Sequence, residues 1–164
     1  MKRRAAVAVV LKDIGDLEIL LVKRKERQQD PWSGQVAFPG GIQKGQEYLL
    51  QTAIRETKEE TGISLSIEDV VGSLTPTFPK NDPRIEVIPF VFFLSKEPKS
   101  KPGDEIELCK WVSIKELLSN KRDFKLPDDR TVPAFILENL VVWGMTYGIL
   151  LDLFEFLGDL KIQI

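Results

Sequence analysis

The chain contains no histidine and a single cysteine among its 164 residues. The absence of histidine excludes a Ser-His-Asp triad, a Cys-His pair and zinc bound by histidine. The single cysteine, Cys109, cannot form an intrachain disulfide, which fits a reducing compartment, and we expect a cytoplasmic protein. Because Cys109 lies in an apolar stretch, we expect a buried, inert thiol. Acid–base chemistry must therefore use carboxylates, Lys, Tyr or water, and any metal should be hard and bound by oxygen.

The chain also has little net charge and no long hydrophobic run. Its formal charge of −2 predicts no broad binding to nucleic acid or to an anionic membrane. The apolar run at 5–11 is short, so we interpret it as a first strand and not as a secretory signal. The uncharged stretch between Glu138 and Asp152 is too short to cross a bilayer. The length fits one domain, and we predict a single domain over residues 1–164.

Apolar periodicity and turn residues predict a mixed α/β chain with a mixed sheet and helices on its faces. The expected strands are 5–11, 17–23, 36–38, 69–78, 85–95 and 105–112, with a loop at 24–34. The expected helices are 47–61, ended by Gly62, a short helix opened by a capping box at 113–116, and an apolar helix over about 134–157. That last helix fits either wholly internal packing or a homodimer interface.

The chemistry is concentrated in the predicted helix at 47–61. Glu56, Glu59 and Glu60 are spaced i, i+3 and i+4, so their side chains gather on one stripe beside the apolar face. Like charges this close destabilise a helix unless a cation binds them, and Mg²⁺ suits a site with a few carboxylates and substrate phosphates. Arg55 lies one turn before Glu59 and can orient it. A solvated acidic face is the usual alternative, but here the acidic stripe flanks the apolar one and follows a glycine pair.

The same residues resemble the signature of a known family. Gly41, Glu47, Arg55-Glu56, Glu59-Glu60 and Gly62-Ile63 match the spacing of the Nudix box, Gly-x5-Glu-x7-Arg-Glu-apolar-x-Glu-Glu-x-Gly-apolar. Thr57 stands at a position that is usually apolar. The resemblance implies a Nudix-type α/β/α sandwich in which the box forms a loop, a helix and a loop. It also implies a metal-dependent hydrolase that cleaves a diphosphate bond in a nucleoside diphosphate derivative.

The resemblance further implies roles for individual residues. Glu56, Glu59 and Glu60 would bind Mg²⁺ or Mn²⁺, with Glu47 as a further ligand, and Arg55 would orient the carboxylates. Gly40 and Gly41 would let backbone approach the ligand, and the carbonyl of Gly41 could reach the metal. Outside the box, Glu105 is a candidate general base, although a solvent-facing carboxylate is an equally good interpretation.

Flanking stretches resemble the coenzyme A diphosphatase group of the family. They are Gly34 to Gly41, residues 105–114, and Trp143-Gly144-Met145-Thr146. Lys23 and Arg24 form the start of the densest basic run near the box and are expected to bind substrate phosphates. Lys44 and the residue after Arg24, a lysine, depart from that group's pattern. The alternatives are a pyrophosphatase for ADP-ribose or another nucleoside diphosphate derivative, and a catalytically silent module that only binds a nucleotide.

Overall fold

The computed structural model describes residues 3–27, 35–162 and 164, so most of the predicted loop at 24–34, including Gly34, lies outside the described residues. The first half of the chain holds the elements β1 (Arg3–Ile14), β2 (Asp16–Arg24), β3 (Val36–Ala37), β4 (Gly40–Ile42), α1 (Leu49–Thr61), the 3-10 turn η1 (Ile67–Asp69) and β5 (Val70–Ser73). The second half holds β6 (Ile85–Leu94), β7 (Ile106–Ser113), α2 (Ile114–Leu118), β8 (Lys121–Lys125), β9 (Thr131–Leu137), β10 (Leu140–Val142) and α3 (Gly144–Asp159).

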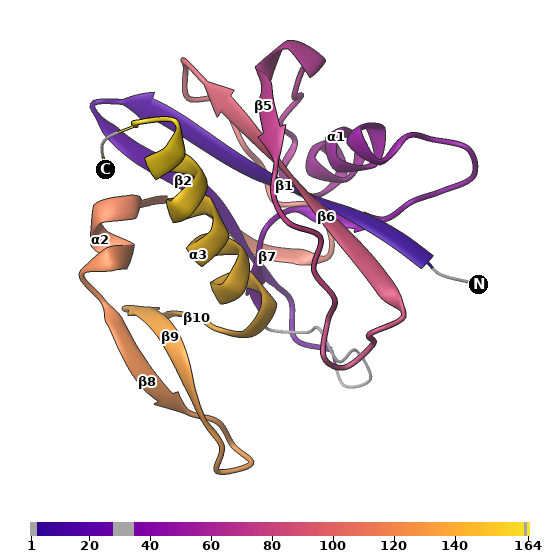
Figure 1. Cartoon of the computed structure of the whole chain (residues 1–164). Helices are drawn as coiled ribbons and strands as arrows, with labels where there is room; N and C mark the ends of the chain where they lie inside the picture. The colour runs from indigo at the N-terminus through magenta and orange to yellow at the C-terminus, as the bar shows by residue number, and fades with distance from the viewer. Residues whose placement is uncertain (1–2, 28–34, 163) are drawn as a thin grey trace.

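Strand β1 runs through the middle of the main sheet (Figure 1). It pairs in parallel with β6 and antiparallel with β2 and β4. Strand β2 also pairs antiparallel with β3 and β7, and β6 pairs antiparallel with β5. Within the described residues these strands form a seven-stranded sheet with both pairing directions, as the sequence predicted.

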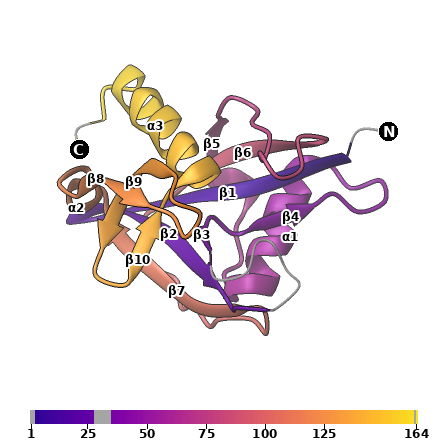
Figure 2. The ribbon, with the colours of Figure 1, turned by 90° about the horizontal axis from the view of Figure 1, so that it is seen from below.

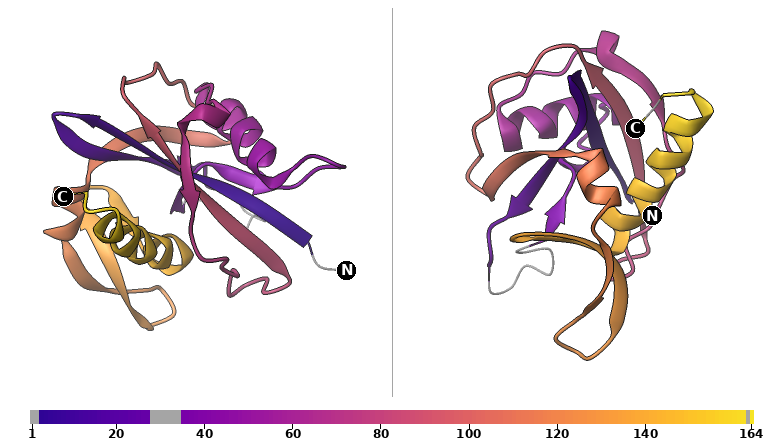
Figure 3. Two further views of the ribbon diagram at one scale, coloured as in Figure 1. Left: turned by 45° about the horizontal axis from the view of Figure 1, so that its top comes forward. Right: turned by 90° about the vertical axis from the view of Figure 1, so that its left-hand side faces the viewer.

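Helices α1 and α3 cover opposite faces of this sheet (Figure 3). Because successive side chains of a strand point to opposite faces, β1 supplies both cores. The core under α1 contains Ala6, Ala8, Val10, Leu20 and Ala53. The core under α3 contains Val9, Leu11, Ile19, Leu21, Leu150 and Leu153. The expected Nudix-type α/β/α sandwich is therefore confirmed.

The prediction of one helix over 134–157 is wrong in its first half. The chain instead forms the hairpin of β9 and β10, in which Leu137 pairs with Leu140 across a two-residue turn. Glu138 occupies this turn with a φ of 23°. Phe135, Ile136 and the valines of β10 are residues that favour strands, and the turn sets their register, so the helix begins only at Gly144.

With β8, this hairpin forms a second sheet, which the sequence analysis did not predict (Figure 2). Other boundaries also differ: the expected strand at 69–78 is limited to Val70–Ser73 and an isolated bridge between Thr77 and Val87, and Gly40–Ile42 forms β4 after the predicted end of the strand at 36–38. In the part of the chain that the structure describes, we find no helix with the length and apolarity needed to cross a membrane.

Candidate metal-binding site

Helix α1 carries the predicted carboxylates and starts two residues later than expected. Tyr48 is its N-cap, and the backbone N–H of Tyr48 donates to the Gln51 side chain at 2.8 Å. The helix ends at Gly62 as predicted, with a φ of 75° and an N–H that donates to the Lys58 carbonyl at 2.9 Å. Glu47 therefore lies in the loop before the helix, while Glu56, Glu59 and Glu60 lie on its last turns.

Glu60 is the most deeply buried of these carboxylates, with 9% of its surface exposed. The backbone N–H of Gly40 in β4 donates to Glu60 Oε2 at 3.3 Å. The pKa of Glu60 is raised to about 8, first by burial and then by the hydrogen bond and negative charge of Glu56, while Gly40 and the positive charge of Arg24 act in the opposite direction. The buried Glu60 and the partly buried Glu56 thus lie side by side at the contact between α1 and β4.

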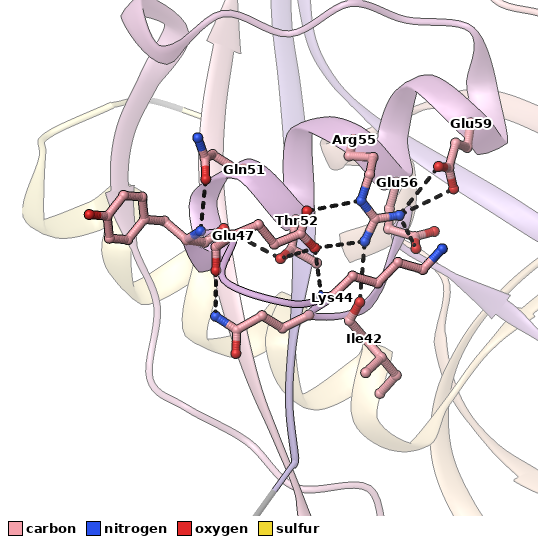
Figure 4. Close-up of polar contacts among 10 residues, drawn as sticks. Ile42, Lys44, Glu47, Gln51, Thr52, Arg55, Glu56 and Glu59 are labelled. Carbon is pink, nitrogen blue, oxygen red and sulfur yellow. Dashed lines mark hydrogen bonds and ion pairs between the residues drawn. The ribbon is translucent and has the colours of Figure 1, made fainter.

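Arg55 donates hydrogen bonds to three of the predicted carboxylates, Glu47, Glu56 and Glu59 (Figure 4). Its Nη1 donates to Glu56 Oε1 at 2.8 Å and to both oxygens of Glu59 at 3.3 Å. Its Nη2 donates to the carbonyl of Ile42 at 3.2 Å. The predicted contact between Arg55 and Glu59 is present, but the shorter hydrogen bonds of the guanidinium go to Glu56 and Glu47.

Glu47 receives hydrogen bonds at both of its oxygens. Oε1 accepts from the backbone N–H of Lys44 at 2.9 Å, from Thr52 Oγ1 at 2.8 Å and from Arg55 Nη2 at 2.8 Å, and Oε2 accepts from Arg55 Nε at 3.1 Å. These bonds, with that of Arg55 first, lower the pKa of Glu47 to about 2. In this arrangement Glu47 supports Arg55 and closes the loop before α1. Neither this pairing nor the role of Thr52 is expected from the sequence, although Thr52 lies one helical turn before Arg55 on the same side of the helix.

Gly40 and Gly41 allow β4 to pass close to its neighbours. A Cβ on Gly40 would lie 2.3 Å from the carbonyl oxygen of Ala6 in β1. A Cβ on Gly41 would lie 2.5 Å from Cδ of Glu56. The glycine pair therefore lets the backbone press against the carboxylate of Glu56, as expected for residues that border a ligand site.

The donor set of this site fits a hard divalent cation. Burial and the nearby charge of Glu56 disfavour a negative charge on Glu60, and a divalent cation bound at Glu60 would offset this cost. Carboxylate oxygens are the ligands that Mg²⁺ and Mn²⁺ prefer. Among the described residues, no group of three acidic or cysteine side chains is arranged to hold a metal ion, and Arg55 forms ion pairs with both Glu56 and Glu59. Binding a cation would therefore require Glu59 to exchange part of its contact with Arg55.

The other predicted site residues, Arg24, Lys23 and Glu105, lie at different distances from the carboxylates. Arg24, at the end of β2, is close enough for its charge to lower the pKa of Glu60. Lys23 pairs in the sheet with Leu108, and Leu108 packs against the core under α3. The ammonium of Lys23 lies 3.4 Å from Oε2 of Glu107. Glu105 is half exposed and lies 2.9 Å from the guanidinium of Arg27. The structure thus brings Arg24 to the carboxylates, whereas Lys23 and Glu105 are paired elsewhere.

Most of the chain matches a known protein family. Residues 1–135 match the family model of the NUDIX domain. Nudix hydrolase 15, a mitochondrial protein of Arabidopsis thaliana, is 29% identical over 91% of this chain and 56% of its own length. An ADP-ribose pyrophosphatase of Methanocaldococcus jannaschii is 34% identical over 62% of this chain and 58% of its own length. The chain thus spans little more than half the length of these two relatives.

The fold is also found in solved structures. A MutT/nudix family protein from Enterococcus faecalis superposes with a TM-score of 0.72 at 23% identity, over 97% of this chain and 63% of that protein. The residues that the family model matches, 1–135, include the glycine pair and the carboxylate helix. The chain belongs to the Nudix domain family.

Proposed function

We propose that this chain is a metal-dependent hydrolase that cleaves a diphosphate bond in a nucleoside diphosphate derivative. The observation that carries the proposal is the buried carboxylate of Glu60 beside the partly buried Glu56, which lies against the glycine strand β4 and is joined to Glu59 through Arg55. A purely structural acidic surface has no reason to bury one carboxylate beside another. A silent module that only binds nucleotide would not need every carboxylate of the box.

The residues of the site have different proposed roles. Glu56, Glu59 and Glu60 would hold Mg²⁺ or Mn²⁺, while Arg55, supported by Glu47, keeps Glu56 and Glu59 in place. A bound divalent cation would supply positive charge to the diphosphate and a water of lowered pKa. Arg24, close to Glu60, would offset the charge of the leaving phosphate.

Glu105 is our candidate for the base that takes the proton of the attacking water. The backbone N–H of Lys25 donates to the Glu105 carbonyl at 3.0 Å, which places Glu105 beside the end of β2 that carries Arg24. Its carboxylate would have to leave Arg27 to act as a base. Glu105→Gln should therefore lower kcat near neutral pH, and the loss should become smaller at high pH, where hydroxide can replace the base.

Two substrate classes fit the chain about equally. The flanking stretches that resemble the coenzyme A diphosphatase group favour coenzyme A or a derivative. The similarity to an ADP-ribose pyrophosphatase favours ADP-ribose or a related nucleoside diphosphate. Both contain a diphosphate attached to adenosine, and coenzyme A carries one more phosphate, at the 3′ position, for which Lys23 and Arg24 are the proposed cations.

One experiment tests the activity and separates the substrates. The purified protein is incubated with Mg²⁺ and, separately, with coenzyme A, dephospho-coenzyme A, ADP-ribose and a nucleoside triphosphate, and products are identified by mass. We expect cleavage at the diphosphate of the preferred adenosine derivative and none in EDTA. Glu59→Gln and Glu60→Gln should remove most of the activity. Full turnover in EDTA, or by the doubly substituted protein, would overturn the proposal.

A further inference from the structure

The connection between β6 and β7 is anchored against the C-terminal end of α1. The N–H of Lys101 donates to the carbonyl of Thr61 at 2.8 Å, and the N–H of Gly103 donates to the carbonyl of Glu60 at 2.8 Å. These carbonyls belong to the last turn of the helix, where no helical N–H follows to bond them. Two backbone hydrogen bonds therefore fix the turn that carries Glu59 and Glu60.

The closest approach in this contact is at Gly103. A Cβ at this position would lie 2.3 Å from the carbonyl oxygen of Glu59 and 3.3 Å from Cα of Glu60. The backbone of Gly103 does not have a positive φ, so its conformation is open to any residue, and only the close approach demands glycine. Any side chain would have to push the connection away from α1, from 2.3 Å to at least 3.0 Å at this point.

The start of the same connection is anchored separately. Lys12 of β1 has 6% of its side chain exposed and forms ion pairs with Glu97 of the connection and, at 3.1 Å, with Glu18 of β2. Its ammonium also lies 4.7 Å from the ring of Trp111. Because the connection is fixed at Glu97 and enters β7 at Ile106, a displacement at Gly103 is not easily absorbed along its length and is passed to the helix.

We propose that Gly103 is a positioning residue of the metal site, which sets the place of Glu59 and Glu60 through its backbone contact with the end of α1. This inference rests on the proposed function, since it assigns the metal to these carboxylates. Displacing a catalytic group by a distance of this size costs about tenfold or more in rate. Gly103→Ala should therefore weaken the binding of the cation itself, and not only the stability of the fold.

The test measures Mn²⁺ binding by electron paramagnetic resonance, without nucleotide, in wild type, Gly103→Ala and Gly148→Ala. Gly148 is the matched control, because it lies on an exposed part of α3 and a Cβ there meets no atom within 4 Å. We expect Gly103→Ala to raise the Kd for Mn²⁺ and to lower kcat, each about tenfold or more, with KM changed by less than about twofold. Gly148→Ala should match wild type in all three.

Circular dichroism and Tm report whether the variants are folded. A folded Gly103→Ala protein with the wild-type Kd for Mn²⁺ overturns the inference, even if its Tm is lower, because the role of Gly103 is then only structural. If Gly103→Ala does not fold, the same Mn²⁺ measurement is made on Lys101→Pro. This variant removes one of the two N–H groups that bond the end of α1, without placing an atom against Glu59. Unchanged Mn²⁺ affinity in that variant also overturns it. If wild type binds no Mn²⁺, the proposed function fails first, and the inference with it.

Discussion

Arg55 shows how a single side chain can organise several carboxylates. Its guanidinium contacts Glu47, Glu56 and Glu59 and also the carbonyl of Ile42, so it ties the loop, the strand β4 and the helix together. Because these partners surround it, the pKa of Arg55 is raised above its already high ordinary value, first by the hydrogen bond to Glu47. The charge of Arg55 is therefore constant at any working pH, and its role must come from geometry.

From this geometry we predict that Arg55→Lys fails to replace arginine. An ammonium keeps the positive charge but has no planar fork that could bond Glu47 and Glu56 at once. We expect kcat to fall about tenfold or more, with a further loss in Arg55→Ala, while circular dichroism remains that of a folded protein. Steady-state kinetics at saturating Mg²⁺ measures this. A wild-type kcat for Arg55→Lys would mean that the residue only screens charge.

Glu47 gives a prediction about pH, measured in EDTA so that metal binding does not contribute. In the folded protein the pKa of Glu47 is lowered from 4.5 to about 2, so its stabilising contribution is complete above 4.5 and is lost as pH falls toward 2. We expect Glu47→Gln to lower the free energy of unfolding at pH 7 by on the order of 1 kcal/mol or more. The difference from wild type should shrink by pH 3.

Urea denaturation of both proteins at pH 7 and pH 3 measures this difference. A loss of equal size at the two pH values would show that shape, and not the charge of Glu47, supports Arg55. Thr52→Val is a useful companion variant, since it removes one neutral donor from the same carboxylate and its effect should change less between the two pH values.

At the scale of elements, the region from β9 to α3 differs most from expectation. Residues 134–142 are as apolar as those of α3, and apolarity by itself does not distinguish a buried strand from a buried helix. The turn at Glu138 and the β-branched residues around it favour a hairpin. Helix α3 then begins at Gly144, after Trp143, and its first turn reaches β3 through Thr146.

The hydroxyl of Thr146 donates to the carbonyl of Val36 at 3.2 Å, and this contact joins α3 to the strand that precedes Gly40. Thr146→Val keeps the shape of the side chain but leaves that buried carbonyl without its donor. We expect a loss of about 1–3 kcal/mol in the free energy of unfolding, with kcat of the folded protein within about twofold of wild type.

Chemical denaturation and steady-state kinetics measure the two effects. The control is Thr131→Val on β9, where the threonine is exposed and the same substitution should change stability by no more than about 0.5 kcal/mol. Equal stability of Thr146→Val and wild type would show that the bond to Val36 does not hold α3 in place.

At the scale of the whole molecule, the buried Glu60 beside Glu56 links cation binding to stability. In EDTA, the folded wild type at pH 8 must keep a negative charge on the buried Glu60 beside Glu56, which lowers its free energy of unfolding. Glu60→Gln removes that charge, so the variant should have the higher Tm at pH 8. With Mg²⁺ at about 100 times its Kd, wild type should gain about 2.7 kcal/mol, or several degrees in Tm. Glu60→Gln should gain much less.

Differential scanning calorimetry with and without Mg²⁺ measures both comparisons, and Glu105→Gln is the control, since Glu105 is not a proposed ligand. A lower Tm for Glu60→Gln in EDTA would mean that the carboxylate stabilises the fold without a metal. An equal Mg²⁺ response in wild type and Glu60→Gln would remove Glu60 from the site.

The local sequence was enough to predict the carboxylate helix, its end at Gly62, the central strands and the family. These features depend on the periodicity of short segments. The i, i+3 and i+4 spacing of Glu56, Glu59 and Glu60 places them on one side of any helix. The alternation of residues along β1 places its side chains in two cores. Such periodicities follow from backbone hydrogen bonding between near neighbours, so they can be read without knowing what packs against the segment.

Other features depend on contacts between segments that are distant in the chain. Glu47 is predicted from the sequence as a metal ligand, and no local pattern indicates that the fold also surrounds it with donors from Lys44, Thr52 and Arg55. Gly103 lies more than forty residues after Glu60, and nothing in its neighbours indicates that it meets the end of α1. The hairpin at 131–142 likewise depends on its pairing with β8. Burial, register and close approach of this kind arise from the packing of the whole chain, which local periodicity does not contain.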